Sequence, residues 1–183
     1  QRGSAICVPT MTTGPEWRNI APDDLSVGCV GFMGGASSLG LGLALARPDR
    51  RVLVLDGDGS LLMQLGSLAT VAGAAPRNLV HFLFKNGVYH TSGAQGIPGG
   101  LTVDFVTMAK GAGYRAAFAI HDLDDFKRRL PEILKILQTL RCKHVLGPIQ
   151  RTSDIWLLER NWDESSSSAN SAHIDFECGI TSR

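Results

Sequence analysis

The chain has 183 residues, which is enough for one domain with a sizeable hydrophobic core. Its 18 Lys and Arg residues nearly balance its 17 Asp and Glu residues, so no strong electrostatic field favours nucleic acid or an anionic membrane as a partner. No apolar run reaches the length of a bilayer span, no signal-peptide pattern opens the sequence, and the four cysteines lack metal-like spacing. These features predict a cytoplasmic protein with reduced thiols.

Two short apolar runs near the start, residues 4–8 and 25–31, predict the first strands of a sheet. Residues 9–15, which follow the first run, are rich in Thr, Gly and Pro and are predicted to be a loop. We interpret Trp17, which follows this loop, as a residue that covers the core.

The second run leads into Gly31-Phe32-Met33-Gly34-Gly35, a loop whose glycines let a flat ligand lie against the backbone. Residues 36–46 follow as a helix of small and branched apolar side chains. This helix is apolar nearly all round, which predicts burial between two layers. Pro48 and Asp49 end it.

The most informative stretch is a strand–helix–strand unit in the middle of the chain. An apolar strand at residues 52–56 ends at the turn Gly57-Asp58-Gly59-Ser60 and is followed by a small-residue helix predicted over residues 61–75. A second apolar strand, residues 78–85, ends at Asn86-Gly87. In a right-handed parallel crossover both strand ends emerge at the same edge of the sheet, where sheets of this kind bind ligands.

Oxygen ligands follow both of these strands. Asp58 offers a carboxylate and Asn86 an amide oxygen, which are hard donors of the kind that Mg²⁺ prefers, with phosphate oxygens as further ligands. The backbone N–H groups of Gly59 and Ser60 open the helix and point toward an anion placed there. The unit therefore predicts a Mg²⁺–diphosphate site. His81, inside the second strand, is interpreted as a half-buried strand residue without a role in that site.

The spacing of these residues resembles a known family. Gly57-Asp58-Gly59, then 26 residues, then Asn86 is similar to the signature of thiamine-diphosphate-dependent enzymes. Residues 29–95 resemble the diphosphate-binding domain of sulfopyruvate decarboxylase (its β subunit) and of phosphonopyruvate decarboxylase. The alternative is an ordinary parallel α/β unit with an aspartate in its turn. The resemblance implies a doubly wound α/β fold, with a mostly parallel sheet and helices on both faces.

The resemblance also implies a set of ligands for the cofactor, thiamine diphosphate, and for its Mg²⁺ ion. Mg²⁺ would be held by Asp58, Asn86 and the backbone carbonyl of Val88. The residues implied to bind the cofactor are Gly31, Met33, Gly57, Asp58, Gly59, Ser60, Asn86, Val88, Tyr89 and Thr91.

Two residues are the candidates for a direct role in catalysis. At the position of Met33 the family has a bulky apolar residue that bends the cofactor between its two rings, while the alternative is a methionine that fills a gap in the core. His90 is a candidate to contact the departing carboxylate or an anionic group of the substrate, because imidazole titrates near neutrality. The alternative for His90 is a solvated loop residue. Three early threonines either face the substrate or are only turn residues, and these are Thr10, Thr12 and Thr13.

The rest of the chain predicts a helix at residues 103–113 and a strand at residues 114–120. An amphipathic helix follows, which Asp122 caps and which Pro131 should kink or split. Residues 155–158 predict a late strand.

We therefore expect a thiamine-diphosphate-binding domain at residues 1–145 and a divergent, partly disordered C-terminal tail at residues 146–183. The implied activity is decarboxylation of a small 2-oxo acid with a second anionic group, such as sulfopyruvate or phosphonopyruvate. Enzymes of this family activate the cofactor with a glutamate on a separate pyrimidine-binding domain. We therefore expect a pyrimidine-binding domain or an α-type subunit as partner, in a homo- or hetero-oligomer, with neither nucleic acid nor membrane bound.

Two other functions stay open from the sequence. The same signature occurs in the cofactor-binding subunit of 2-oxoacid:ferredoxin oxidoreductases, although the cysteine spacing here argues against an iron–sulfur cluster. A non-catalytic assembly or regulatory subunit is the third hypothesis. The divergent tail favours it, and the intact set of Asp58, Asn86 and Met33 opposes it.

Overall fold

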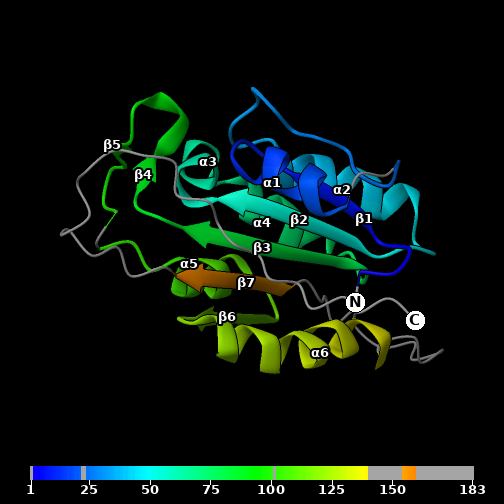
Figure 1. The fold of residues 1–183 in the computed structure, drawn as a ribbon. Coiled ribbons are helices and arrows are strands. Elements are labelled where there is room, and N and C mark those ends of the chain that lie inside the picture. Colours follow the sequence, from blue (N-terminus) through cyan, green and yellow to red (C-terminus); the bar gives the residue numbers. More distant parts are fainter. Residues whose placement is uncertain (1, 22–23, 101, 140–153, 160–183) are drawn as a thin grey trace.

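The structure, a computed structural model, describes residues 2–21, 24–100, 102–139 and 154–159 of the chain. Its centre is a five-stranded parallel sheet in the order β1-β2-β3-β7-β6 (Figure 1). The strands are β1 (Ile6–Pro9), β2 (Val52–Gly57), β3 (Leu79–Lys85), β6 (Ala116–Ile120) and β7 (Asp154–Glu159). The first five residues of both β2 and β3 are buried, as is typical of strands covered on both faces.

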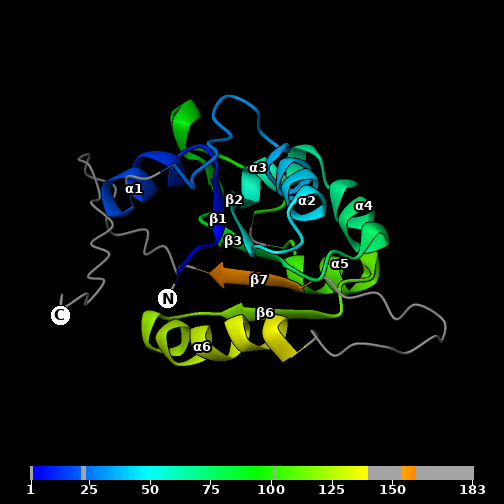
Figure 2. The ribbon, with the colours of Figure 1, turned by 90° about the vertical axis from the view of Figure 1, so that its right-hand side faces the viewer.

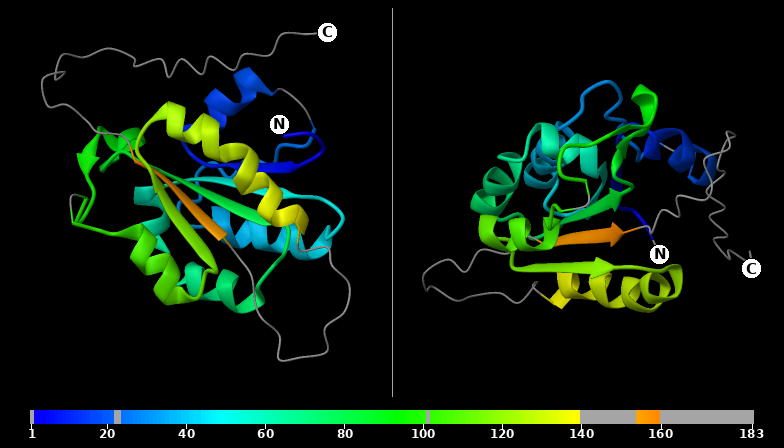
Figure 3. Two further views of the ribbon diagram at one scale, coloured as in Figure 1. Left: turned by 90° about the horizontal axis from the view of Figure 1, so that it is seen from below. Right: turned by 90° about the vertical axis from the view of Figure 1, so that its left-hand side faces the viewer.

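Helices cover both faces of the sheet, as Figures 2 and 3 show. On one face lie α2 (Ala36–Ala46), α4 (Ser67–Ala74) and α5 (Phe105–Ala112). On the other lie α1 (Thr13–Ile20) and α6 (Leu123–Thr139). This three-layer arrangement confirms the predicted α/β fold class with a parallel sheet. Among the described helices, none is both long and apolar enough to cross a membrane.

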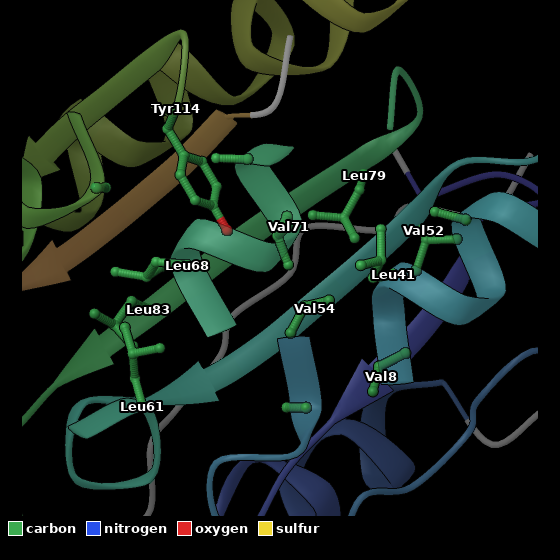
Figure 4. Packing of buried hydrophobic residues seen from close by; sticks show 14 of the residues in the cluster. Val8, Leu41, Val52, Val54, Leu61, Leu68, Val71, Leu79, Leu83 and Tyr114 are labelled. Atoms are coloured by element: carbon green, nitrogen blue, oxygen red, sulfur yellow. The ribbon is translucent and has the colours of Figure 1, made fainter. Parts of the chain in front are cut away.

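The larger part of the core lies between the sheet and the layer of α2, α4 and α5. Side chains from strands and helices interdigitate there (Figure 4), among them Val52, Val54, Leu79, Leu83, Leu41, Leu68 and Val71. The helix α2 crosses β2 closely because Gly40 has no side chain. A Cβ atom at that position would lie 2.3 Å from Cγ2 of Val54, so only glycine permits this approach.

The loop predicted at residues 9–15 is wrong at its end, because α1 already begins at Thr13. Pro15 lies in the first turn of this helix, where the missing N–H of a proline costs no hydrogen bond.

Two further sequence predictions about these elements are wrong. In the described part of residues 25–31, only isolated bridges join Ser26 to Cys7 and Cys29 to Thr10. The ladder is interrupted because Pro9 of β1 has no backbone N–H to donate. The helix predicted over residues 61–75 is two helices, α3 (Asp58–Met63) and α4, because the backbone of Gln64 leaves the helical region, with φ −142° and ψ 52°.

The last helix, α6, runs through Pro131 without splitting, contrary to one of the two predicted effects of that residue. A proline removes one hydrogen bond of the helix, whereas Leu130 and Ile133 on either side keep packing against the sheet. Asp122 caps the helix as predicted, since its Oδ1 accepts a hydrogen bond from the N–H of Asp125 at 2.7 Å.

The late strand predicted at residues 155–158 is β7, and it lies between β3 and β6 rather than at the edge of the sheet. A segment expected to belong to the divergent tail therefore supplies an interior strand of the sheet. The rest of that tail lies outside the described residues, and so does the disorder predicted for it.

Candidate functional site

The carboxyl ends of β2 and β3 meet at one edge of the sheet, where α3 and a short hairpin lie (Figure 1). The two strands pair up to Gly57 and Phe84, so the segments that contain Asp58 and Asn86 start side by side, as the sequence predicts. The hairpin consists of β4 (Val88–Tyr89), the 3₁₀ helix η1 (His90–Ser92) and β5 (Gln95–Gly96).

Asp58 lies at the centre of this edge and has only 2% of its surface exposed. Its Oδ1 accepts a hydrogen bond from the N–H of Gly59 at 2.8 Å. Its Oδ2 accepts one from Gly87 N–H at 2.8 Å and one from Asn86 N–H at 3.1 Å. Burial raises the pKa of Asp58, while these N–H donors act in the opposite direction. A buried carboxylate of this kind favours a bound cation, which offsets its desolvation.

Asn86 is held at the end of β3 by its own side chain. Its Oδ1 accepts a hydrogen bond from the N–H of Val88 at 3.0 Å, which closes a tight turn between the strand and the hairpin. Together with the contact between Asp58 and the Asn86 backbone, this turn brings Asp58, Asn86 and Val88 into one small region. Carboxylate and amide oxygens have more than one lone pair, so these contacts leave acceptor capacity for a ligand.

Tyr89 covers the start of α3. A Cβ atom added at Gly59 would lie 2.7 Å from Cδ1 and Cε1 of the Tyr89 ring and 3.1 Å from Cγ2 of Ile97. Ile97 is itself tied to the turn after β3, because its N–H donates to the carbonyl of Gly87 at 3.0 Å. Glycine at position 59 therefore lets the hairpin pack directly on the turn that carries Asp58.

The loop of residues 31–35 reaches the same helix from the other side. The N–H of Gly34 donates to Oγ of Ser60 at 2.9 Å, and a Cβ atom at Gly34 would lie 2.7 Å from Cβ of Gln64. Next to this contact Met33 is half-buried, whereas Phe32 is 62% exposed. The loop of residues 31–35 therefore contacts the turn of residues 57–60, although Met33 and Asp58 are 25 positions apart in the sequence. A ligand site formed by the loop and the turn together requires such a contact.

The remaining candidates divide into exposed residues and residues bonded to the backbone. His90 and Thr91 are exposed in η1. Thr10 is buried, and its hydroxyl donates to the carbonyl of Cys29 at 2.8 Å. The hydroxyl of Thr13 donates to the carbonyl of Thr10 at 2.6 Å, which favours the interpretation of both threonines as turn residues. Trp17 packs against the part of the core that lies between the sheet and the layer of α1 and α6, as predicted.

Sequence reasoning missed a buried polar pair beside the turn. His81, predicted to be half-buried, is fully buried, and its Nε2 lies 3.3 Å from Oδ2 of Asp56, which is equally buried. The available signal was the alternation of the strands, which places both side chains on the face of Val54 and Leu79. A polar residue in each strand at such a position is a pattern that periodicity alone can detect.

The donor set fits a magnesium–diphosphate ligand better than a closed metal site. Among the described residues, no group of three or more His, Cys, Asp or Glu side chains could hold a metal ion. A cation at Asp58 would therefore have one carboxylate and would depend on amide, carbonyl and phosphate oxygens for its other ligands. This is the way in which Mg²⁺ is commonly bound with a phosphorylated ligand.

Residues 16–141 match the family described as thiamine pyrophosphate enzyme, C-terminal TPP binding domain. The chain is 45% identical over 127 residues to phosphonopyruvate decarboxylase of Streptomyces hygroscopicus, over 69% of this chain and 31% of that protein. It is 38% identical over 118 residues to sulfopyruvate decarboxylase subunit beta of Methanocaldococcus jannaschii, over 64% of this chain and 60% of that subunit.

A solved structure gives the same likeness. The thiamine diphosphate-dependent 4-hydroxybenzoylformate decarboxylase of Rhodococcus jostii RHA1 superposes with a TM-score of 0.62 at 26% identity, over 88% of this chain and 30% of that one. These matches confirm the resemblance that the turn and its spacing predict. The chain spans about a third of the length of the phosphonopyruvate decarboxylases that it matches.

Proposed function

The chain belongs to the thiamine pyrophosphate enzymes, whose C-terminal TPP binding domain it carries, and we propose that it holds the diphosphate of the cofactor through Mg²⁺. Asp58, Asn86 and the carbonyl of Val88 would bind the ion. The observation that carries this proposal is the carboxylate of Asp58, which is buried between the ends of two strands and fixed there by three backbone N–H groups. Its burial disfavours the charged form unless a cation is bound.

The rest of the cofactor would extend along the surfaces next to this turn. Its diphosphate would lie against Gly57, Gly59 and Ser60, with Tyr89 and Thr91 of the hairpin as further contacts. Its ring system would lie at the loop of residues 31–35. In that loop the backbone of Gly31 is exposed and Met33 is half-buried, so a flat ligand can reach both.

The reaction that we propose is decarboxylation of a small 2-oxo acid with a second anionic group. The names of the matched relatives, phosphonopyruvate decarboxylase and sulfopyruvate decarboxylase, support this substrate class. Thiamine diphosphate, when bound, supplies a carbon nucleophile and an acceptor for the electrons that remain when CO₂ departs. The chain itself would anchor the diphosphate, support the rings at Met33 and exclude water. His90, exposed in η1, is the candidate to contact the substrate.

A partner that supplies the pyrimidine-binding half of the site is part of the proposal. The Methanocaldococcus relative is named as a subunit, and the phosphonopyruvate decarboxylases are about three times as long as the matched region. The apolar side chains of Val30 and Phe32 are 63% and 62% exposed beside the candidate cofactor loop. A covering surface there would bury them and close the site.

The proposal is tested by calorimetric titration of the chain with thiamine diphosphate, first with Mg²⁺ and then with EDTA. We expect binding with Mg²⁺ and its loss with EDTA, because the carboxylate of Asp58 and the diphosphate are both anionic and repel each other when no cation lies between them. Binding that is indifferent to EDTA would overturn the metal assignment. No binding under either condition would favour the non-catalytic subunit, and a protein coloured by an iron–sulfur cluster would favour the oxidoreductase.

A further inference from the structure

Two buried polar side chains beside the turn have no part in the chemistry described so far. Asp56 and His81 lie on the neighbouring strands β2 and β3, with side chains that are 0% exposed. Nε2 of His81 is 3.3 Å from Oδ2 of Asp56. By the alternation of the strands both share the face of Val54 and Leu79, which packs against the layer of α2, α4 and α5.

These two side chains are only partly satisfied. Among the described residues, Oδ2 of Asp56 and both ring nitrogens of His81 have no aligned hydrogen-bond partner. The buried hydroxyl of Tyr114 also has none there, and Tyr114 belongs to the core on the face of Val54 and Leu79 (Figure 4). Burial, and after it the charge of Asp56, raises the pKa of Tyr114, so this hydroxyl lies within electrostatic reach of the carboxylate. Apolar side chains of similar size would cost less here, so stability alone does not account for the pair.

The other oxygen of Asp56 connects the pair to the cofactor turn. Oδ1 accepts a hydrogen bond from the N–H of Gly57 at 2.9 Å, and Gly57 is the residue that leads from β2 into Asp58. The orientation of this peptide group determines the position of the Asp58 backbone, and with it the direction in which the Asp58 side chain reaches the N–H of Gly87. A carboxylate that is free to rotate would hold Gly57 less firmly than one that a neighbouring imidazole restrains.

We propose that His81 is a positioning residue for the diphosphate site, which acts through Asp56: it restrains the carboxylate that orients Gly57 and so directs Asp58 toward the metal. The assignment rests on the proposed function. It differs from an ordinary packing role because it predicts a local effect on the turn and an effect on cofactor affinity that other core residues of β3 do not share.

The first test needs no cofactor. Amide hydrogen exchange of Gly57 and Gly59 is measured by NMR in the wild-type chain and in the variants His81→Leu, Asp56→Asn and Leu79→Ala. Leu79 is the matched control, because it is fully buried on the same face of β3, two residues before His81. We expect exchange at the two glycines to rise at least tenfold in His81→Leu relative to amides elsewhere in the sheet. In Leu79→Ala we expect no selective rise.

Two further comparisons separate positioning from packing. Asp56→Asn keeps an oxygen that accepts from Gly57 and gains an N–H that can donate to the imidazole, so it should retain slow exchange at the turn. Because His81 acts through Asp56, the double variant Asp56→Ala with His81→Leu should exchange no faster than Asp56→Ala alone. If His81→Leu fails to fold, His81→Gln is measured in its place with the same readouts.

The second test is the dissociation constant of thiamine diphosphate with Mg²⁺. We expect affinity to fall about tenfold in His81→Leu, and by less than twofold in Leu79→Ala and in Asp56→Asn. Unchanged exchange at Gly57 in His81→Leu overturns the positioning role, whatever the wild-type chain binds. A wild-type chain that does not bind the cofactor overturns the proposed function instead. In that case, slow amide exchange at Gly57 that depends on His81 would mean that His81 only stabilises the turn.

Discussion

The backbone N–H of Gly87 donates a hydrogen bond to Oδ2 of Asp58 at 2.8 Å, across 29 positions of the sequence. This contact ties the end of β2 to the end of β3 through the side chain that is the candidate metal ligand. The same carboxylate thus has two duties, because it fixes the backbone around Asn86 and offers its remaining lone pairs to a cation. Changes at Asp58 should therefore alter both the loop and the affinity for the cofactor.

Replacing Asp58 with Ala removes the carboxylate from the site. We expect the affinity for thiamine diphosphate with Mg²⁺ to fall at least tenfold, about 1.4 kcal/mol, because the ion loses the one carboxylate that the proposal assigns to it as a ligand. Asn86→Ala should behave similarly. Asp49→Ala is the control, since that carboxylate is exposed and pairs with Arg47 at 2.7 Å. Titration calorimetry on the three variants decides the point, and wild-type affinity in Asp58→Ala would contradict it.

Two glycine variants make a matched pair at the hairpin contact. Gly59→Ala places a methyl group 2.7 Å from the Tyr89 ring, which must move, so we expect both the free energy of unfolding and the cofactor affinity to fall. Gly73→Ala in α4 meets open space and should stabilise the chain by about 0.5–1 kcal/mol. Urea unfolding and cofactor titration are measured together. Equal affinity in Gly59→Ala and wild type would mean that the hairpin does not shape the site.

The parts of this fold that follow from local chemistry could be predicted from the sequence. Apolar runs predicted the strands of the five-stranded sheet, although the run at residues 25–31 forms only isolated bridges, and the glycine turn after β2 predicted the edge at which Asp58 and Asn86 meet. The break at Gln64 could not be predicted, because the residues on both sides have the composition of one helix. The interior position of β7 could not be predicted either, since strand order depends on packing between segments that are distant in sequence.

The buried pair of Asp56 and His81 shows the same limit at the level of single side chains. Strand alternation places both residues on one face, but only the register of β2 against β3 brings the ring nitrogen to 3.3 Å from the carboxylate. The ring nitrogens of a histidine in an apolar strand can form hydrogen bonds with backbone groups, water or other side chains. The sequence alone therefore could not distinguish a half-buried His81 from one that contacts an acid.

The cap of α5 gives a prediction about pH. Asp104 accepts hydrogen bonds from the N–H and the hydroxyl of Thr107, and the side-chain bond is the largest cause of a lowered pKa for Asp104. A carboxylate with a lowered pKa stabilises the fold above its ordinary pKa and loses that contribution as pH falls through the lowered value. Asp104→Ala should thus cost about 1 kcal/mol at neutral pH and progressively less below about pH 4. Urea unfolding at several pH values measures this difference.

Asp104→Ser is the control for this experiment. Serine is a good cap without a charge, so the variant should retain most of the stability at neutral pH and should lose the acid dependence of this contribution. If Asp104→Ala and wild type differ by the same free energy at pH 3 and pH 7, ionisation of Asp104 does not stabilise α5.

The role of Met33 is tested by turnover rather than by stability. In a complete complex, Met33→Ala should lower kcat more than it lowers cofactor affinity, because it removes support from the cofactor rings and leaves the diphosphate contacts in place. Met108 of α5 packs against the core and serves as the matched methionine. Met108→Ala should lower the free energy of unfolding and leave kcat within twofold. Equal kcat in Met33→Ala and wild type would return Met33 to a packing role.

The last prediction is that this chain alone does not catalyse decarboxylation. The resemblance assigns activation of the cofactor to a glutamate on a separate pyrimidine-binding domain. Among the described residues, Glu16 lies on α1 and Glu132 on α6, both in the layer on the opposite face of the sheet from α4 and α5. Among the glutamates that the structure describes, Glu159 is the one at the carboxyl end of a strand, where it pairs with Lys85 in the register of β7 against β3.

Supplying the pure chain with thiamine diphosphate, Mg²⁺ and phosphonopyruvate or sulfopyruvate, and following CO₂ release, tests this directly. We expect a rate at least about 10²–10⁴-fold below that of the complete enzyme, the usual cost of losing one positioned proton-transfer group, with a further loss because Val30 and Phe32 stay open to water. Adding a chain that carries the pyrimidine-binding half should restore turnover. Full activity without a second polypeptide would refute the division of labour, and loss of that activity in Glu159→Gln would then identify the glutamate within this chain.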